Sequence, residues 1–112
     1  MVEYTLDDIF YSLSDPIRRD ILQRVSQIEH SVGELVARYD VSFAAISKHL
    51  KVLEEAHLIV KRKEGRKQMV RIAPDALRLA DDYLEQYRET WQGRHDKLQT
   101  LLNYEGGGYG QD

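Results

Sequence analysis

Residues 31–55 read SVGELVARYDVSFAAISKHLKVLEE, and this stretch decides the fold. Ser31 is followed three residues later by Glu34, the spacing of a capping box at the start of a helix. Ser42 is a suitable N-cap for the next helix, and only about three residues separate the two helices. Two short helices joined this tightly are typical of a helix-turn-helix. The stretch therefore predicts that motif, with residues 42–56 as its second helix.

The second helix of this motif has an apolar face and a polar face. Ile46, Leu50 and Leu53 recur at helical spacing and are expected to point inward. At about 100° per residue, the outward arc and its flanks carry Ala44, Ala45, Ser47, Lys48, His49 and Lys51. Small and polar side chains at the start of such a helix can reach base edges, and the cations that follow suit phosphate groups. The pattern favours a DNA-recognition helix.

A β-hairpin with a basic tip is expected directly after this helix. Residues 58–63 run from β-branched side chains into charge, and residues 68–72 partly alternate. Residues 64–67, Glu-Gly-Arg-Lys, form a Gly-centred turn between them. Alone, such a turn is explained equally well as a solvated surface. Its place after a helix-turn-helix favours the wing of a winged version, spanning residues 58–72.

Helices are also predicted on both sides of the motif. Thr5 is a suitable N-cap for a first helix, and Asp15 followed by Pro16 begins a second. Pro74 begins a long helix that is expected to end at about residue 102. Its apolar residues repeat in a heptad-like stripe of Leu77, Ala80, Leu84, Tyr87, Trp91, Leu98 and Leu101. This stripe is wider than one small domain covers, so a dimer contact is favoured over packing within the chain.

The predicted fold is mainly α with a small β-hairpin wing: four helices, two strands and a last helix, in that order. A length of 112 residues suits one domain, which we assign to residues 1–102. Residues 103–112 hold four of the seven glycines and little to bury, so a disordered tail is expected there.

The charge of the chain is concentrated in one segment. The net charge of −3, taken alone, disfavours a nucleic-acid partner. Residues 42–71, however, hold eight basic residues against three acidic ones, a net charge of +5. The remainder holds eight basic against 16 acidic residues, a net charge of −8. The basic segment coincides with the expected recognition helix and wing.

Five motifs together resemble the ArsR-type (ArsR/SmtB-like) winged helix-turn-helix repressors, over about residues 5–102. They are LSDPIRRDIL at 13–22, SVGEL at 31–35, SFAAISKHLKVL at 42–53, EAHLI at 55–59 and the Gly65-Arg66 turn. The combination is specific, although each piece alone would be weak. The resemblance implies a homodimeric transcriptional repressor that binds double-stranded operator DNA and dimerises through its first and last helices.

The expected sites follow from this resemblance and from the cations. The resemblance implies base contacts near the start of the recognition helix and a contact from the wing, and the lysines and arginines supply phosphate contacts. The expected DNA-binding set is Ser42, Phe43, Ala44, Ser47, Lys48, His49, Lys51, Arg62, Lys63, Arg66 and Lys67. The expected dimer interface is Leu6, Ile9, Phe10, Leu77, Ala80, Leu84, Tyr87, Trp91, Leu98 and Leu101.

Other classes of protein find little support in the sequence. Apolar runs fall short of the ~18–20 residues of a membrane helix, and the N-terminus lacks the pattern of a secretory signal, so a cytoplasmic location is expected. The chain has no cysteine, and its four histidines lack metal-ligand spacing. We therefore expect no metal and no other cofactor, unlike in metal-sensing members of the family. No catalytic set stands out, so an enzyme is not expected.

Several alternatives stay open at this point. A winged helix can also be a protein-docking module, or it can sense a small molecule. Phe43 can meet a thymine methyl group or pack on the preceding turn. His49 can contact DNA or be an ordinary surface residue. Arg18 and Arg19 are expected to be helix-surface charges or ion-pair donors.

Overall fold

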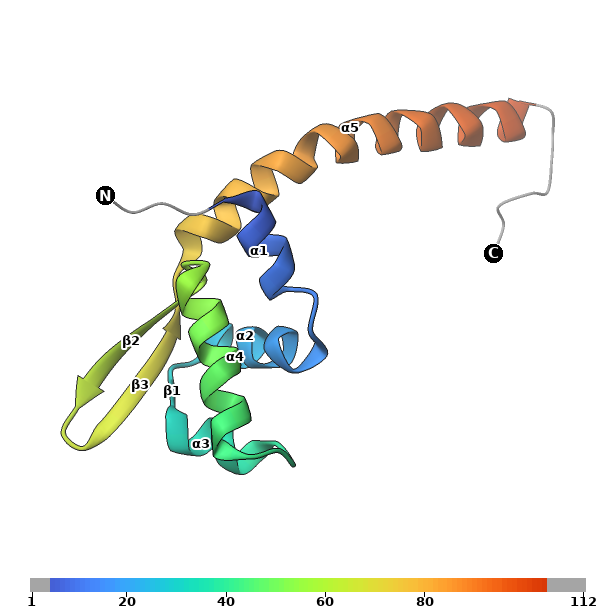
Figure 1. The fold of residues 1–112 in the computed structure, drawn as a ribbon. Coiled ribbons are helices and arrows are strands. Elements are labelled where there is room, and N and C mark those ends of the chain that lie inside the picture. Colours follow the sequence, from blue (N-terminus) through green and yellow to red (C-terminus); the bar gives the residue numbers. More distant parts are fainter. Residues whose placement is uncertain (1–4, 105–112) are drawn as a thin grey trace. The chain divides into compact units, whose positions relative to one another are not determined.

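The fold, taken from a computed structural model, is described for residues 5–104, without the side chains of residues 94–97, 103 and 104. Figure 1 shows eight elements in the order α1, α2, β1, α3, α4, β2, β3 and α5. Their bounds are α1 Leu6–Ser12, α2 Pro16–Gln27, β1 His30–Ser31, α3 Val32–Arg38, α4 Phe43–Glu55, β2 Ile59–Glu64, β3 Lys67–Ile72 and α5 Pro74–Tyr104. The mainly α fold with a hairpin is confirmed.

Four helices begin where their capping residues predict. Thr5 and Ser42 accept hydrogen bonds from backbone N–H groups three residues on, and Asp15 accepts from Ile17 and Arg18. The reciprocal capping box of Ser31 and Glu34 is present at the start of α3. Side-chain caps satisfy N–H groups that a helix cannot pair internally, which is why such local signals fix where each helix begins.

The sheet has one strand more than predicted. β2 and β3 form the expected antiparallel hairpin, with Glu64 opposite Lys67 across the turn. β1 pairs with the other edge of β3, which gives the strand order β1-β3-β2. A two-residue strand carries no hydrophobic periodicity, so no pattern in the sequence predicts it. Its effect is to attach the middle of β3 to the segment between α2 and α3.

α4 ends in a Schellman motif that aims the chain into the hairpin. The N–H of His57 donates to the carbonyl of Glu54, and the N–H of Leu58 donates to that of Leu53. His57 has a φ of 60°, the left-handed conformation that this position requires. His57 is therefore structural, as its place at the junction of helix and strand suggests.

The core is formed by the inward face of α4 and its surroundings. Ile46, Leu50 and Leu53 are buried there, as predicted from their spacing. The helices α1, α2 and α3 and the strand β2 all contact α4. The other buried apolar residues of this core are Ile9, Ile21, Leu22, Val25, Leu35, Ala56, Leu58, Ile59, Val70, Ala76 and Ala80.

The chain divides into two units after Ala80. The first unit holds the core, the helix-turn-helix, the sheet and the first residues of α5. The second unit holds the rest of α5, which continues through Tyr104 and so takes in the first two residues of the expected tail. The other residues of that tail, 105–112, lie outside the described part of the chain. None of the described helices is both long and apolar enough to cross a membrane.

The structure corrects the expected dimer surface at two positions. Ile9 has an exposed fraction of 0 % and Ala80 one of 5 %, because both pack into the core of the same chain. Neither side chain can face a second subunit while this core is intact. The other expected interface residues are half-buried or exposed.

A hydrogen bond ties α2 to the end of α3. Tyr39 Oη donates to Asp20 Oδ2 at 2.6 Å, and Arg24 Nε donates to the same oxygen at 2.9 Å. The bond from Tyr39, followed by that from Arg24, lowers the pKa of Asp20. Partial burial, followed by the bond to Asp20, raises the pKa of Tyr39 to about 12.

Tyr39→Phe is expected to lower the free energy of unfolding at neutral pH by about 1 kcal/mol, because it removes this bond. The pKa of Asp20 is lowered on folding, so the stability linked to it is present above the unfolded value of 3.8 and is lost as the pH falls through the folded value. Urea unfolding of both proteins should therefore show a difference that shrinks in acid.

Tyr11→Phe is the matched control, because the Tyr11 side chain is 62 % exposed. We expect it to change the free energy of unfolding by less than about 0.5 kcal/mol. A Tyr39→Phe effect that is equal at neutral and acid pH would contradict the role of Asp20.

Candidate nucleic-acid interface

The outward face of α4 carries the side chains expected at DNA. Phe43, Ala44, Lys48 and Lys51 are exposed, Ser47 is half-buried, and Ser42 caps the helix through a 3.1 Å bond from the N–H of Ala45. Phe43 is 63 % exposed, so most of its side chain is open to a partner. Burial of the opposite face fixes the helix, while this face stays open to a partner.

The tip of the wing is a two-residue turn built around Gly65. Gly65 has a φ of +64°, and Arg66 does not share that positive φ. A positive φ at the first of two turn residues is the pattern of a type II′ hairpin, whose twist matches that of its strands. The turn leaves Lys63, Arg66 and Lys67 exposed near the tip, with Lys63 and Lys67 on opposite faces of the hairpin.

Two cations of the wing form ion pairs with carboxylates of this chain. Arg62 donates to Glu29 at 2.6 and 3.0 Å and to Glu64 at 3.0 Å. Its bond to Glu29, followed by that to Glu64, raises the pKa of Arg62. Lys61 Nζ lies 3.3 Å from Glu54 Oε1. These pairs connect the wing to the loop after α2 and to the end of α4, so Arg62 belongs to the support of the wing, which the sequence did not indicate.

The remaining cations of the expected set are available to a partner. Lys48, Lys51, Lys63, Arg66 and Lys67 form no salt bridge with any other residue in the described part of the chain. Three of them lie at the wing tip and two on α4. Five unpaired cations on two adjacent elements can contact the phosphates of one duplex.

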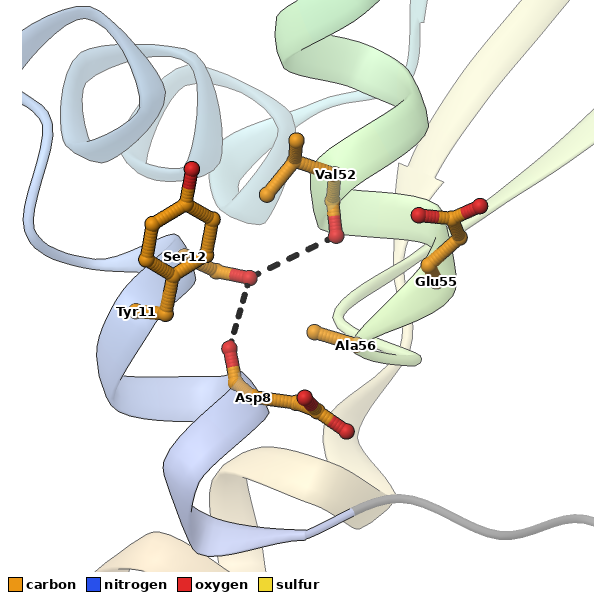
Figure 2. A pocket seen from close by; sticks show the side chains of 6 residues that line it. All are labelled: Asp8, Tyr11, Ser12, Val52, Glu55 and Ala56. Atoms are coloured by element: carbon orange, nitrogen blue, oxygen red, sulfur yellow. Dashed lines mark hydrogen bonds between the residues drawn. The ribbon is translucent and has the colours of Figure 1, made fainter.

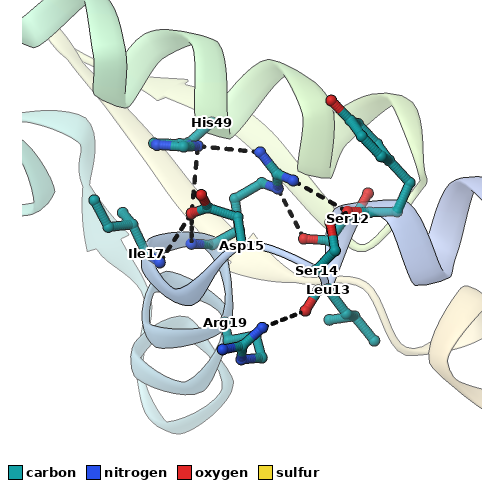
Figure 3. Close-up of polar contacts among 9 residues, drawn as sticks. Ser12, Leu13, Ser14, Asp15, Ile17, Arg19 and His49 are labelled. Atoms are coloured by element: carbon teal, nitrogen blue, oxygen red, sulfur yellow. Dashed lines mark hydrogen bonds and ion pairs between the residues drawn. The ribbon is translucent and has the colours of Figure 1, made fainter.

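His49 lies at the edge of this surface and is partly turned inward (Figure 3). Its Nδ1 is 3.3 Å from Arg18 Nη1 and 3.8 Å from Asp15 Oδ2, and its side chain is 19 % exposed. It is therefore a partnered residue and not the ordinary surface residue of one interpretation. Partial burial raises the pKa of Asp15, but the hydrogen bonds from the N–H groups of Arg18 and Ile17 outweigh it, and the pKa lies below its ordinary value.

Arg18 differs most from what the sequence predicts. It is only 7 % exposed, so it is not a helix-surface charge. Its Nε donates to the carbonyl of Ser12 at 2.8 Å and its Nη2 to that of Tyr11 at 3.0 Å. Arg19 behaves as expected for an exposed residue and donates to the carbonyl of Leu13 at 2.8 Å. The contacts of Arg18 are tertiary, so no local pattern in the sequence predicts them.

A pocket of about 350 Å³ lies between α1 and α4 (Figure 2). Its lining residues are Asp8, Tyr11, Ser12, Val52, Glu55 and Ala56. Ser12 Oγ donates to the carbonyl of Asp8 at 2.9 Å and lies 3.4 Å from that of Val52. Two carboxylates in the lining disfavour a phosphate there, so this pocket is not part of the candidate DNA surface.

The described residues include no group of three or more His, Cys, Asp or Glu side chains that could hold a metal ion. The side chain of His95, the histidine of the last helix, lies outside the described residues.

Comparison with known proteins agrees with the helix-turn-helix found in the structure. A family model described as a helix-turn-helix domain matches residues 13–62. The arsenical resistance operon repressor of Escherichia coli is 30 % identical over 95 residues, which are 84 % of this chain and 79 % of the repressor. The solved structure of an ArsR family transcriptional regulator is 31 % identical with a TM-score of 0.72, and the match covers 82 % of this chain and 97 % of that one.

This chain belongs to the ArsR family of helix-turn-helix transcriptional regulators. A further relative, the HTH-type transcriptional regulator Rv2034 of Mycobacterium tuberculosis, is 37 % identical over 71 residues, which are 63 % of this chain and 66 % of that protein. The family resemblance that the motifs indicate is confirmed. The relatives compared here are named as transcriptional regulators or repressors.

Arg62→Ala is expected to change the salt dependence of DNA binding less than Lys63→Ala, because Arg62 is already neutralised by Glu29 and Glu64. Removal of one cation from a phosphate group flattens the slope of log K against log salt by about 0.9. Fluorescence anisotropy with a duplex at several salt concentrations should show nearly this change for Lys63→Ala and less than half of it for Arg62→Ala. Equal changes would mean that Arg62 leaves its carboxylates when DNA binds.

Proposed function

We propose that this ArsR-family protein is a homodimeric repressor that binds a pseudo-palindromic operator and acts in the cytoplasm. The N-terminal half of α4 enters the major groove, where Phe43, Ala44 and Ser47 discriminate between bases. The cations of α4 and the wing tip contact the phosphates on either side. Two copies of α4 would read half-sites about 34 Å apart, one turn of the duplex. Occupancy of the operator would block transcription.

One observation carries the proposal: two unpaired cations lie on the open polar face of α4 and three more at the tip of the wing that follows it, while the chain outside residues 42–71 has a net charge of −8. Double-stranded DNA has regularly spaced phosphate charges and base edges that side chains can distinguish, so it fits both features. A docking module for an acidic protein would use the cations, but it would not need small side chains at the start of an exposed helix. The charge distribution therefore favours DNA over a protein ligand.

The dimer is proposed from the exposed stripe of α5. Leu84, Tyr87, Trp91, Leu98 and Leu101 have exposed fractions between 44 and 68 %. Tyr83 and Tyr87 pack edge to face, and their hydroxyl groups are 3.0 Å apart. Arg94 interrupts this stripe once, but an exposed apolar stripe of this length on a monomer marks a protein interface, and its heptad spacing suits a second copy of the same helix.

A mobility-shift titration with the DNA upstream of the protein's own gene tests the proposal. The wild-type protein should shift this duplex at lower concentration than a random duplex of equal length. Arg66→Ala with Lys67→Ala should weaken binding to both duplexes and flatten the salt slope by about 0.9 for each phosphate group that loses its cation. Arg78→Ala, an exposed cation outside the motif, is the control and should leave the slope unchanged. An unchanged slope in the double variant would remove the wing from the proposal.

Leu84→Glu is expected to convert the dimer to monomers, because it places a charge in the proposed interface. Static light scattering should report half the wild-type mass. Gln86→Glu adds the same charge to an exposed position on another face of α5 and should leave the mass unchanged. A dimer that survives Leu84→Glu would place the interface elsewhere.

A further inference from the structure

Arg18 is a buried charge with a specific set of partners. Two of its nitrogens donate to carbonyls of the last turn of α1, and its guanidinium carbon lies 5.1 Å from the centre of the Tyr11 ring. Its third nitrogen, Nη1, faces Nδ1 of His49 on α4. Burial of a guanidinium costs free energy unless all its donors are satisfied. Each of the three nitrogens has one hydrogen-bond partner here, from α1 or α4, and these bonds offset much of that cost.

The contact with Arg18 determines which nitrogen of His49 carries the proton. A guanidinium has donors only and is always charged, so Nη1 can bond to Nδ1 only if Nδ1 is the acceptor. The proton of the imidazole must then be on Nε2. If both ring nitrogens of His49 carried a proton, the N–H at Nδ1 would point at the N–H of Arg18 Nη1, and two positive charges would lie side by side. Asp15 Oδ2 is near Nδ1 at 3.8 Å, but it is beyond hydrogen-bonding distance and already accepts from two backbone N–H groups.

The other nitrogen of His49 is left for a partner. Both contacts shown for this ring in Figure 3 reach the same nitrogen, and Nε2 is on the other side of the ring. His49 flanks the outward arc of α4, next to the exposed Lys48. The flank of a helix that lies in the major groove faces the sugar-phosphate backbone. An N–H donor there suits a phosphate oxygen.

We propose that Arg18 is a positioning residue that holds His49 with its Nε2–H as the donor to a DNA phosphate oxygen. The inference rests on the proposed DNA-binding function and adds two residues to its mechanism. Arg18 does not touch DNA. It joins α1 to α4 and fixes the ring of His49 before DNA arrives, so no orientation has to be selected on binding.

The first test needs no DNA. Long-range ¹H–¹⁵N NMR of the histidine rings in the wild-type protein, with His49→Gln to assign the signal, should show His49 as the Nε2–H tautomer near neutral pH. A ring protonated on Nδ1, or on both nitrogens, overturns the proposal. Arg18→Lys keeps the charge but loses the planar fork, and it should mix the two tautomers. If Arg18→Lys does not fold, the wild-type spectrum still decides which nitrogen of His49 carries the proton.

The second test measures binding to a random 30-base-pair duplex and to the upstream duplex by fluorescence anisotropy. His49→Asn keeps an acceptor near the position of Nδ1 but loses the outer donor, and it should weaken binding to both duplexes by about tenfold, as expected for a bond to a charged group. His49→Gln can place an N–H near the position of Nε2 and should bind more tightly than His49→Asn. His30→Asn, from a histidine of similar exposure on β1, is the control.

The outcomes separate the two proposals. Wild-type protein that binds neither duplex would overturn the DNA-binding function and the phosphate contact with it, while the NMR result would still stand for the tautomer. Wild-type binding with no loss in His49→Asn would overturn the phosphate contact alone. A loss on the upstream duplex only would make His49 a base contact, which also contradicts the proposal.

Discussion

The burial of one face of α4 is the constraint on which the first unit depends. Ile46, Leu50 and Leu53 are completely or almost completely buried, and three helices and a strand surround them. Any side chain on the opposite face is therefore held at a fixed angle to the core. A recognition helix needs this arrangement, because base discrimination depends on side chains that keep their register in the groove. The same three residues thus stabilise the fold and set the direction of the surface that we propose contacts DNA.

The cations of the basic segment serve two purposes, and net charge alone does not separate them. Arg62 and Lys61 pair with Glu29, Glu64 and Glu54, and these pairs support the wing. Exposed pairs of this kind add little stability, but they balance the charge of these two side chains. The cations without such pairs remain for phosphate groups. The net charge of +5 on residues 42–71 therefore includes Lys61 and Arg62, whose charges are already paired with carboxylates of this chain and are not offered to DNA.

The sequence predicted what local chemistry determines and missed what depends on tertiary contact. Thr5, Asp15, Ser31 and Ser42 act on N–H groups two or three residues away, so the start of each helix could be predicted. The apolar face of α4 followed from its period. Arg18 and Arg62 look like surface charges in the sequence, because their partners lie in other elements. β1 depends on pairing with a strand about 40 residues further along the chain, and two residues show no periodicity.

The stripe on α5 changes its role along the helix. Ala76 and Ala80 are buried in the core of the first unit, and their small side chains allow close packing there. From Leu84 onward the side chains on the stripe are larger, and among the described residues of the second unit none is buried. A helix of this length gains most of its stability from packing of an apolar face and little from propensity. Gly93 lowers that propensity further. The second unit therefore needs a partner surface more than the first does, and in the proposed dimer a second copy of the stripe would supply one with the same heptad spacing.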